Sequence, residues 1–223
     1  MTLIIDSSKK MKKNGFLALV LAAAMSLGGG NVLAQDAVKK SGEDLLRFGG
    51  NLAFITSKVY IYDGHKGMNR YSWRPGVSFL AEYEHVWPSG WGIGTTLDYN
   101  HTVYGGNLYK SSYDFNLFYW GVGGVYRLKL GDRWRINFGL GLGWAQIGGD
   151  VDEESSGVGV MEKAGVEYRL SPSIGLNLQL IEIASWFPKP ESYKQLERKN
   201  PGEFEGDYGF YRLELSAGIT IHL

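Results

Sequence analysis

Residues 91–104 read WGIGTTLDYNHTVY, and this stretch alternates between two kinds of side chain. The first kind is mostly large and apolar, and its members are Trp91, Ile93, Thr95, Leu97, Tyr99, His101 and Val103. The second kind is small or polar, and its members are Gly92, Gly94, Thr96, Asp98, Asn100 and Thr102. Successive side chains of a β-strand point to opposite faces, so a period of two predicts a strand with one apolar and one polar face.

The same period recurs along the chain, in residues 77–84, 134–144, 160–170, 174–180 and 211–223. Two further segments, residues 47–62 and 113–128, fit the period less regularly. In the second of them we expect a bulge near residues 121–124, because glycine inside a strand often marks an extra residue that shifts the alternation by one. Together these segments predict an all-β chain with eight strands.

The connections between the predicted strands alternate in length. Three are short, namely residues 88–90, 129–132 and 171–173, and four are long, namely residues 63–72, 105–112, 148–156 and 188–207. Most of the strands exceed the roughly 9 to 11 residues that a tilted strand needs to cross a membrane. We therefore expect an eight-stranded antiparallel up-and-down transmembrane β-barrel, with four extracellular loops and both chain termini in the periplasm.

Aromatic side chains gather near the ends of the predicted strands. Those beside the short connections are Trp87, Trp91, Trp134 and Tyr168. Those toward the long connections are Tyr99, Tyr104, Trp144, Trp186 and Tyr208. Between these ends the apolar faces carry almost no charge. Two aromatic girdles around an apolar band favour a membrane barrel over a soluble barrel, which would present polar residues to water.

The first 34 residues differ from the rest of the chain. Basic residues around Met11, a short apolar run and small residues before Gln35 predict a secretory signal peptide over residues 1–34, with Met11 as an alternative start. The apolar run is shorter than the roughly 20 residues of a membrane-spanning helix. Residues 35–46 are then expected to be a short periplasmic lead-in, and residues 47–223 the barrel domain.

Charge and cysteine content exclude several classes of function. The chain has 23 basic and 23 acidic residues, so no net positive charge would attract nucleic acid, and we expect no nucleic-acid partner. It contains no cysteine, which excludes disulfide bonds and thiolate zinc sites.

The alternation, the unequal connections, the signal peptide and the final strand YRLELSAGITIHL resemble the small eight-stranded outer-membrane barrels of the OmpA-transmembrane, OmpX-like or "porin family" type. The resemblance covers residues 47–223. It implies the outer membrane of a Gram-negative bacterium, with outer-membrane lipid and lipopolysaccharide around the barrel and the insertion machinery as a partner during biogenesis. A larger envelope complex is a further candidate partner. Such barrels often end on an aromatic residue that the insertion machinery reads, whereas this chain ends on Leu223.

The polar faces of the predicted strands provide the candidate functional residues. We expect an inward polar network of Glu82, Glu84, Asp98, Asn100, Arg135, Asn137, Lys163, Glu167, Arg169, Asn177, Gln179, Arg212 and Glu214. An eight-stranded barrel is only wide enough for side chains to fill it, so opposite charges in this network should pair and plug the lumen. A narrow pore lined by the same residues and a binding pocket are the alternatives.

A plugged barrel favours a structural or interaction role, in which the loops serve adhesion, resistance or docking onto an envelope complex. The alternative is a small channel for polar or hydrophobic solutes, and the third candidate is a lipid-modifying enzyme. No histidine is followed two positions later by serine, a pairing of base and nucleophile that would favour lipid hydrolysis. We therefore expect no catalytic residue, no cofactor and no enzymatic activity.

Two stretches look superficially like ligand sites. The carboxylates of Asp150, Asp152, Glu153 and Glu154 are weak candidates for binding Ca²⁺, but their loop lacks the twelve-residue calcium pattern, and we expect a solvated acidic loop. Residues 138–144 read FGLGLGW, whose spacing G-x-G-x-G differs from the dinucleotide-binding G-x-G-x-x-G. We expect these glycines to point inward and leave room for long side chains, so a bulky residue at Gly141 should impair barrel assembly.

Overall fold

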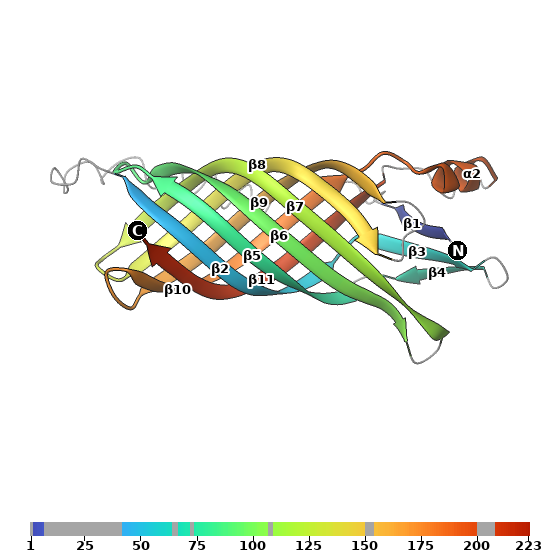
Figure 1. Cartoon of the computed structure of the whole chain (residues 1–223), viewed down its shortest axis with the longest axis horizontal. Coiled ribbons are helices and arrows are strands. Elements are labelled where there is room, and N and C mark those ends of the chain that lie inside the picture. The colour runs from blue at the N-terminus through green and yellow to red at the C-terminus, as the bar shows by residue number, and fades with distance from the viewer. Residues whose placement is uncertain are drawn as a thin grey trace.

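The computed structural model describes residues 2–6, 42–63, 67–71, 74–106, 109–149, 154–199 and 208–223. Its main body is a closed antiparallel barrel (Figure 1). The eight barrel strands are β2 (Glu43–Ile55), β5 (Arg74–Val86), β6 (Trp91–Gly106), β7 (Tyr109–Leu130), β8 (Trp134–Gly149), β9 (Ser155–Arg169), β10 (Ile174–Trp186) and β11 (Gly209–His222). Each strand pairs with the next barrel strand, and β11 pairs with β2 to close the ring. The predicted all-β, eight-stranded antiparallel architecture is confirmed.

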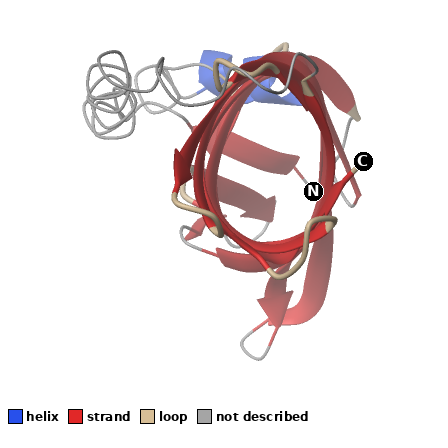
Figure 2. Ribbon diagram, turned by 90° about the vertical axis from the view of Figure 1, so that its left-hand side faces the viewer, coloured by secondary structure: helices blue, strands red, loops and turns tan. Residues whose placement is uncertain are grey.

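Three short turns lie at one end of the barrel, which we call the short-turn end. They connect β5 to β6, β7 to β8 and β9 to β10, as predicted. Gly90 and Gly131 in the first two turns have positive φ angles of 87° and 72°, which glycine adopts without steric cost. The C-terminus lies at this end too, because the Leu223 N–H donates a hydrogen bond of 2.9 Å to the carbonyl oxygen of Asp44, near the start of β2. Figure 2 views the barrel from the short-turn end.

The opposite end, which we call the long-loop end, carries further secondary structure. β3 (Lys58–Asp63) and β4 (Gly67–Tyr71) form an antiparallel pair between β2 and β5, and α2 (Glu191–Lys199) lies between β10 and β11. β1 (Thr2–Asp6), within the segment predicted as a signal peptide, pairs with β3. The predicted loop 105–112 is largely strand, because β6 and β7 extend into it. Among the described residues, no helix is long and apolar enough to cross a membrane.

Two strands differ in detail from the sequence-based expectation. β2 begins at Glu43, before the predicted barrel start at Arg47. The bulge expected at residues 121–124 is wrong, because the pairing of β7 with β6 and β8 continues through these glycines without a shift. The alternation was obscured because β7 is apolar on both faces toward the long-loop end, where Tyr119 points inward and Trp120 outward.

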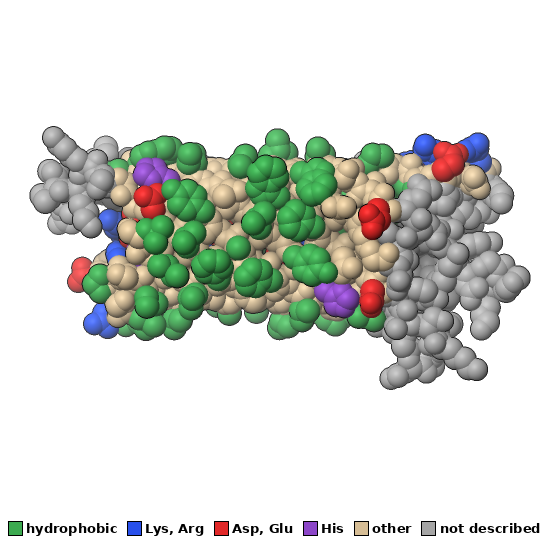
Figure 3. Space-filling model, in the orientation of Figure 1, with side chains coloured by type: hydrophobic (Ala, Val, Ile, Leu, Met, Phe, Trp, Pro, Cys, Tyr) green, Lys and Arg blue, Asp and Glu red, His purple; other side chains and the backbone are tan. Residues whose placement is uncertain are grey.

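The outer wall of the barrel is apolar. Phe79, Leu142 and Leu178 on three different strands are about half exposed, and many similar side chains surround them. The face in Figure 3 is covered by hydrophobic side chains along the strands, with acidic, basic and histidine side chains toward the two ends. This distribution leaves an apolar band around the barrel, as the alternation predicts.

Aromatic residues lie at both borders of this band. At the short-turn end, the ring of Trp91 lies 4.9 Å from that of Tyr126, and the ring of Trp134 lies 4.9 Å from that of Tyr168. Trp87 is also exposed at this end.

At the long-loop end, Trp144 contacts Phe118, Trp186 contacts Tyr211, and Tyr99 is exposed. Tyr208 was wrongly placed in this outer girdle, because its side chain is buried among aromatic rings. The side chain of Tyr104 lies outside the described residues.

Candidate functional site

The barrel interior holds a balanced set of charges. Among the described residues, five buried basic side chains face five buried acidic ones: Arg47, Arg127, Arg135, Lys163 and Arg212, and Glu82, Glu84, Asp98, Glu167 and Glu214. Buried ions are tolerated when they are paired, and an equal number of each sign makes complete pairing possible. All ten come from inward positions of the alternating strands.

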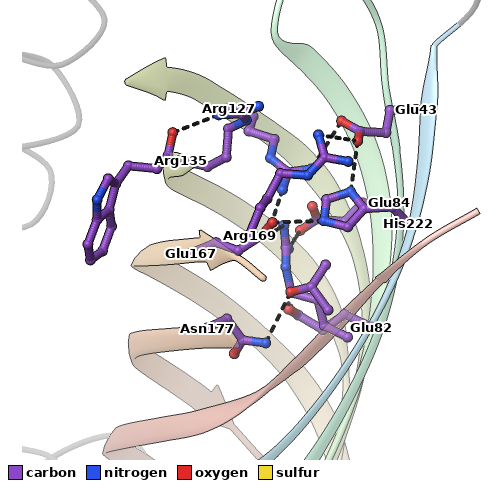
Figure 4. A network of polar contacts seen from close by, with 12 residues as sticks. Glu43, Glu82, Glu84, Arg127, Arg135, Glu167, Arg169, Asn177 and His222 are labelled. Atoms are coloured by element: carbon purple, nitrogen blue, oxygen red, sulfur yellow. Dashed lines mark hydrogen bonds and ion pairs between the residues drawn. The ribbon is translucent and has the colours of Figure 1, made fainter. Parts of the chain in front are cut away.

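The network toward the short-turn end joins opposite walls of the barrel (Figure 4). Arg47 on β2 lies 2.5 Å from a carboxylate oxygen of Glu84 and 3.7 Å from one of Glu82, both on β5. Lys163 on β9 forms ion pairs with the same two glutamates, at 2.7 Å from Glu84. Because β5 and β9 stand opposite each other in the eight-stranded ring, these pairs cross the full width of the lumen.

Glu167 on β9 links this cluster to the rim of the short-turn end. Its carboxylate oxygens lie 2.5 Å from an Arg127 nitrogen and 2.9 Å from His222 Nε2. The other ring nitrogen of His222 lies 2.7 Å from Glu43, which is also 3.6 Å from Arg169. The network thus ends at the barrel mouth, where Glu43 and Arg169 are part-exposed.

A second network lies near the middle of the barrel. Arg212 on β11 forms an ion pair with Asp98 on β6, and its Nε lies 2.6 Å from Glu214. Glu214 also accepts hydrogen bonds of 2.6 Å from Asn51 and 2.9 Å from Ser78. Two of the strands involved, β2 and β11, are not neighbours of β6, so this network also crosslinks distant parts of the wall.

Toward the long-loop end, apolar side chains fill much of the interior beside the Arg212 network. A buried cluster there contains Leu80, Tyr119, Met161, Ile181 and Ile183, from four strands. The space between Leu117, Ile183 and Phe210 is too small to hold a water molecule. A smaller apolar cluster of Leu45, Val86 and Val125 lies at the short-turn end. The lumen is therefore filled along its length, mainly by ion pairs toward the short-turn end and by apolar side chains together with the Arg212 network toward the long-loop end.

An aromatic cluster closes the long-loop end of the interior. Phe115 on β7 and Phe210 on β11, from opposite walls, have ring centroids 4.7 Å apart. Phe210 also contacts Phe187 and Tyr208, and Tyr208 contacts Tyr193 of α2. Tyr193 is fully buried, so α2 is anchored to this end by an aromatic side chain.

The glycines of the FGLGLGW stretch face the interior, as expected. A Cβ at Gly139 would overlap the stem of Lys163, and a Cβ at Gly143 would overlap the Trp120 carbonyl oxygen and lie 2.6 Å from the Gly121 Cα. At Gly141 the nearest atoms would be at 3.4 Å, which is ordinary contact. Glycine at position 139 therefore makes room for the lysine that bridges the lumen.

The structure places the thirteen predicted network residues at inward positions, but it does not connect all of them. Arg135 donates hydrogen bonds to the carbonyl oxygens of Gly131 and Trp134 in the turn rather than to a carboxylate. Asn137 is buried without a side-chain hydrogen bond. Asn100 donates to the Val77 carbonyl oxygen at 3.3 Å. Gln179 and Asn177 do join the network, by hydrogen bonds to Glu82 and Thr220 at 3.2 and 3.1 Å.

Sequence reasoning missed four members of the network. Arg47 and Arg127 lie in the two segments with irregular alternation, and Glu43 lies in the predicted lead-in. His222 lies near the end of β11 and was not included in the predicted network. The signal for Arg47 was present, because it alternates with outward Leu46 and Phe48 along β2.

The weak metal candidates Asp150, Asp152 and Glu153 lie outside the described residues, and Glu154 is exposed. Within the described part of the chain, no three histidine, aspartate or glutamate side chains could hold a metal ion together. His85 and His101 lie on the outer face, with hydrogen bonds to Asp44 and Asn116 at 2.8 Å each.

The sequence and the fold match known proteins of one kind. The family model described as "Outer membrane protein beta-barrel domain" matches residues 18–183. No curated protein matches the sequence. Neisserial surface protein A has 16% identity and a TM-score of 0.51, covering 80% of this chain and 96% of that chain, and it shares the fold. The attachment invasion locus protein Ail of Yersinia pestis has 14% identity, coverage of 81% and 99%, and a TM-score of 0.46. The outer membrane protein AlkL has 13% identity, coverage of 87% of this chain and 96% of that chain, and a TM-score of 0.43.

Proposed function

The chain belongs to the outer membrane protein beta-barrel domain family, and from this premise we propose that it is a closed barrel with an interaction role. The barrel sits in the outer membrane of a Gram-negative bacterium with its short-turn end in the periplasm. Its long-loop end faces outward and serves adhesion, resistance or docking onto an envelope complex.

The observation that carries a closed lumen is the set of contacts between opposite walls. Lys163 on β9 pairs with Glu82 and Glu84 on β5, and at the other end the rings of Phe115 and Phe210 meet. A permeating solute would have to separate these groups, and separating the ion pairs would leave uncompensated buried charges. A barrel of eight strands leaves no lumen beyond the space that such side chains fill.

The outward role of the loops is supported by what lies at the long-loop end. The exposed face of α2 carries Glu191, Lys194 and Arg198, whose side chains are between 51% and 68% exposed. The buried Tyr193 fixes the helix to the barrel while this charged face remains free for contact. An ordered charged surface on an extracellular loop suits contact with a partner or with lipopolysaccharide phosphates.

Osmotic swelling of proteoliposomes tests the closed lumen. Vesicles containing the folded protein should swell in arabinose no faster than protein-free vesicles, while vesicles containing a general porin swell rapidly. Swelling above the protein-free control would contradict the closed barrel and support the small-channel alternative.

Proteolysis of intact cells tests the orientation. Trypsin should cut the loop of α2 at Lys194 or Arg198 in intact cells, and a variant with Lys194→Gln, Arg198→Gln and Lys199→Gln should resist this cleavage. Cleavage of the loop only after the outer membrane is permeabilised would show the opposite orientation.

A further inference from the structure

Two carboxylates lie on the lipid-facing side of the barrel, where the sequence analysis expected almost no charge. Glu162 on β9 lies between buried Met161 and Lys163, and Glu182 on β10 lies between Ile181 and Ile183. Because side chains alternate along a strand, both glutamates point outward. The pairing of β9 with β10 sets them directly opposite each other.

The position of this pair is within the apolar band. Glu182 is four residues from Trp186 in the girdle of the long-loop end and eight from Ile174 at the other end of β10. For a strand tilted by about 45° with a rise of about 3.3 Å per residue, these separations correspond to depths of roughly 9 and 19 Å. Both carboxylates are therefore well inside the hydrocarbon layer of the membrane.

The surroundings of the pair offer no counter-charge. Leu140 lies opposite Glu162 on β8, and Leu213 lies opposite Glu182 on β11. Among the described outward residues of β8, β9, β10 and β11, none is lysine or arginine. Small and branched residues, namely Val160, Ala164 and Ala184, flank the glutamates along their own strands.

Asp44 provides a contrast, because it is also an outward carboxylate but has partners. Its Oδ1 accepts a hydrogen bond of 2.7 Å from the Tyr83 hydroxyl and lies 2.8 Å from His85 Nδ1. Glu162 and Glu182 have no such donor in the described part of the chain, and Glu162 Oε2 is buried without a hydrogen bond. Ionisable groups that face lipid are costly and mark functional positions in membrane proteins.

We propose that the outer face of β9 and β10 around Glu162 and Glu182, which we call the acidic wall, is a docking surface for a second outer-membrane protein. That partner presents a lysine or arginine from its own lipid-facing wall at the same depth. In the low dielectric of the membrane, the cation supplies the missing counter-charge. The small side chains of Ala164 and Ala184 leave room for a lysine or arginine to approach the two carboxylates.

Other occupants fit the charges less well. A second copy of the chain in a two-fold contact would bring four carboxylates together without a cation. Lipid acyl chains offer no donor, and the phosphates of lipopolysaccharide carry the same sign as the acidic wall. The docking surface lies on the barrel wall, so this inference goes beyond the role proposed for the loops.

Site-specific photo-crosslinking in native outer membranes tests the proposal. A photoreactive residue at Leu180, beside Glu182, should give an adduct with one other membrane protein. The control position is Leu97 on β6, which stands opposite β10 in the ring and has a similar exposure of 44% against 39% for Leu180. It should give no protein adduct. The double substitution Glu162→Gln and Glu182→Gln should reduce the Leu180 adduct at least about tenfold.

The charge requirement is tested on the captured protein itself. It should carry a lysine or arginine in a membrane-spanning strand, and replacing that residue with glutamine should reduce the adduct as strongly as the double glutamine variant does. An unchanged shift in gel mobility on boiling shows that each variant of the barrel still folds.

Three results would overturn the proposal: lipid adducts alone at Leu180, an adduct that the double glutamine variant leaves undiminished, or an adduct with a second copy of this chain. None of them bears on the closed lumen or on the orientation of the loops. Vesicle swelling tests the closed lumen, and proteolysis of intact cells tests the orientation of the loops.

Discussion

Two regions of the barrel interior, the ionic cluster around Lys163 and the apolar cluster around Tyr119, fill the lumen with opposite chemistry. Toward the short-turn end, Arg47, Lys163 and Glu84 fill the lumen with charges that pair across it. Toward the long-loop end, Tyr119 and Ile183 fill it with apolar surface. Both fillings are buried, and both connect strands that are distant in the ring.

The two clusters differ in what happens when one member is removed. Deleting one ion of a buried pair leaves its partner charged and unsolvated, which costs more than the pair itself contributes. Deleting part of an apolar side chain costs the lost contacts and a cavity. The ionic cluster should therefore be sensitive to the identity of the charge, and the apolar cluster to side-chain volume.

The largest expected effect is that of Arg47→Ala. This change leaves Glu82 and Glu84 with Lys163 as their remaining nearby cation, and it should lower the free energy of unfolding by about 3 to 5 kcal/mol. Denaturant titration of the barrel in lipid vesicles measures this change in the free energy of unfolding. In the control variant Arg47→Ala with Glu84→Ala, much of the loss should be recovered. A loss under about 1 kcal/mol for Arg47→Ala would contradict buried pairing.

In the apolar cluster, Ile183→Ala should lower the free energy of unfolding by about 3 kcal/mol in the same assay, because it opens a cavity beside Tyr119 and Met161. The matched control is Ile183→Val, which keeps most of the volume and should cost about 1 kcal/mol. If valine and alanine were equally tolerated, the apolar cluster would not be tightly packed.

A smaller effect is expected where the barrel wall itself limits volume. Gly143→Ala places a methyl group against the Trp120 carbonyl oxygen and should cost about 1 to 3 kcal/mol in the unfolding assay. Gly141→Ala has contacts of 3.4 Å and should cost less. Equal losses at the two positions would contradict the close approach of β7 to β8 at Gly143.

The smallest effect concerns ion pairs in water rather than in the lumen. The hydrogen bond from Lys194 and the charges of Lys194 and Arg198 lower the pKa of Glu191 below its ordinary value of 4.5. This stabilisation of α2 is present above pH 4.5 and is lost as the pH falls through the lowered pKa. Lys194→Ala should move the Glu191 pKa back toward 4.5 in an NMR titration and leave denaturant unfolding of the barrel unchanged. An unchanged pKa would show that the pair does not form.

The sequence predicts the strands and the inward charges because both follow from a period of two. Asp98 and Glu214 were identified in this way, since their apolar outward neighbours set the phase. The apolar cluster was not predicted, because inward Tyr119 lies between the equally apolar outward residues Phe118 and Trp120 and leaves no alternation to read. A single strand also cannot reveal partners across the lumen, such as Glu82 for Lys163, because these depend on closure of the ring.

The outer wall shows a second limit of the pattern. Glu162 and Glu182 occupy outward positions in strands whose phase is clear, but the regular residues around them dominate the pattern. A carboxylate in an apolar outward row is noticed only when every residue of the strand is assigned to the inward or the outward face. Glu162 and Glu182 lie on neighbouring strands, and only the register of β9 with β10 shows that they stand directly opposite each other.

The central claim is that side chains from opposite walls close the lumen, and ionic conductance tests it most directly. Purified folded protein in a planar lipid bilayer at 1 M KCl should give no steady single-channel steps above the protein-free baseline. Steady, reproducible steps of uniform size would mean that ions pass between Lys163 and its glutamates, and they would contradict the closed barrel.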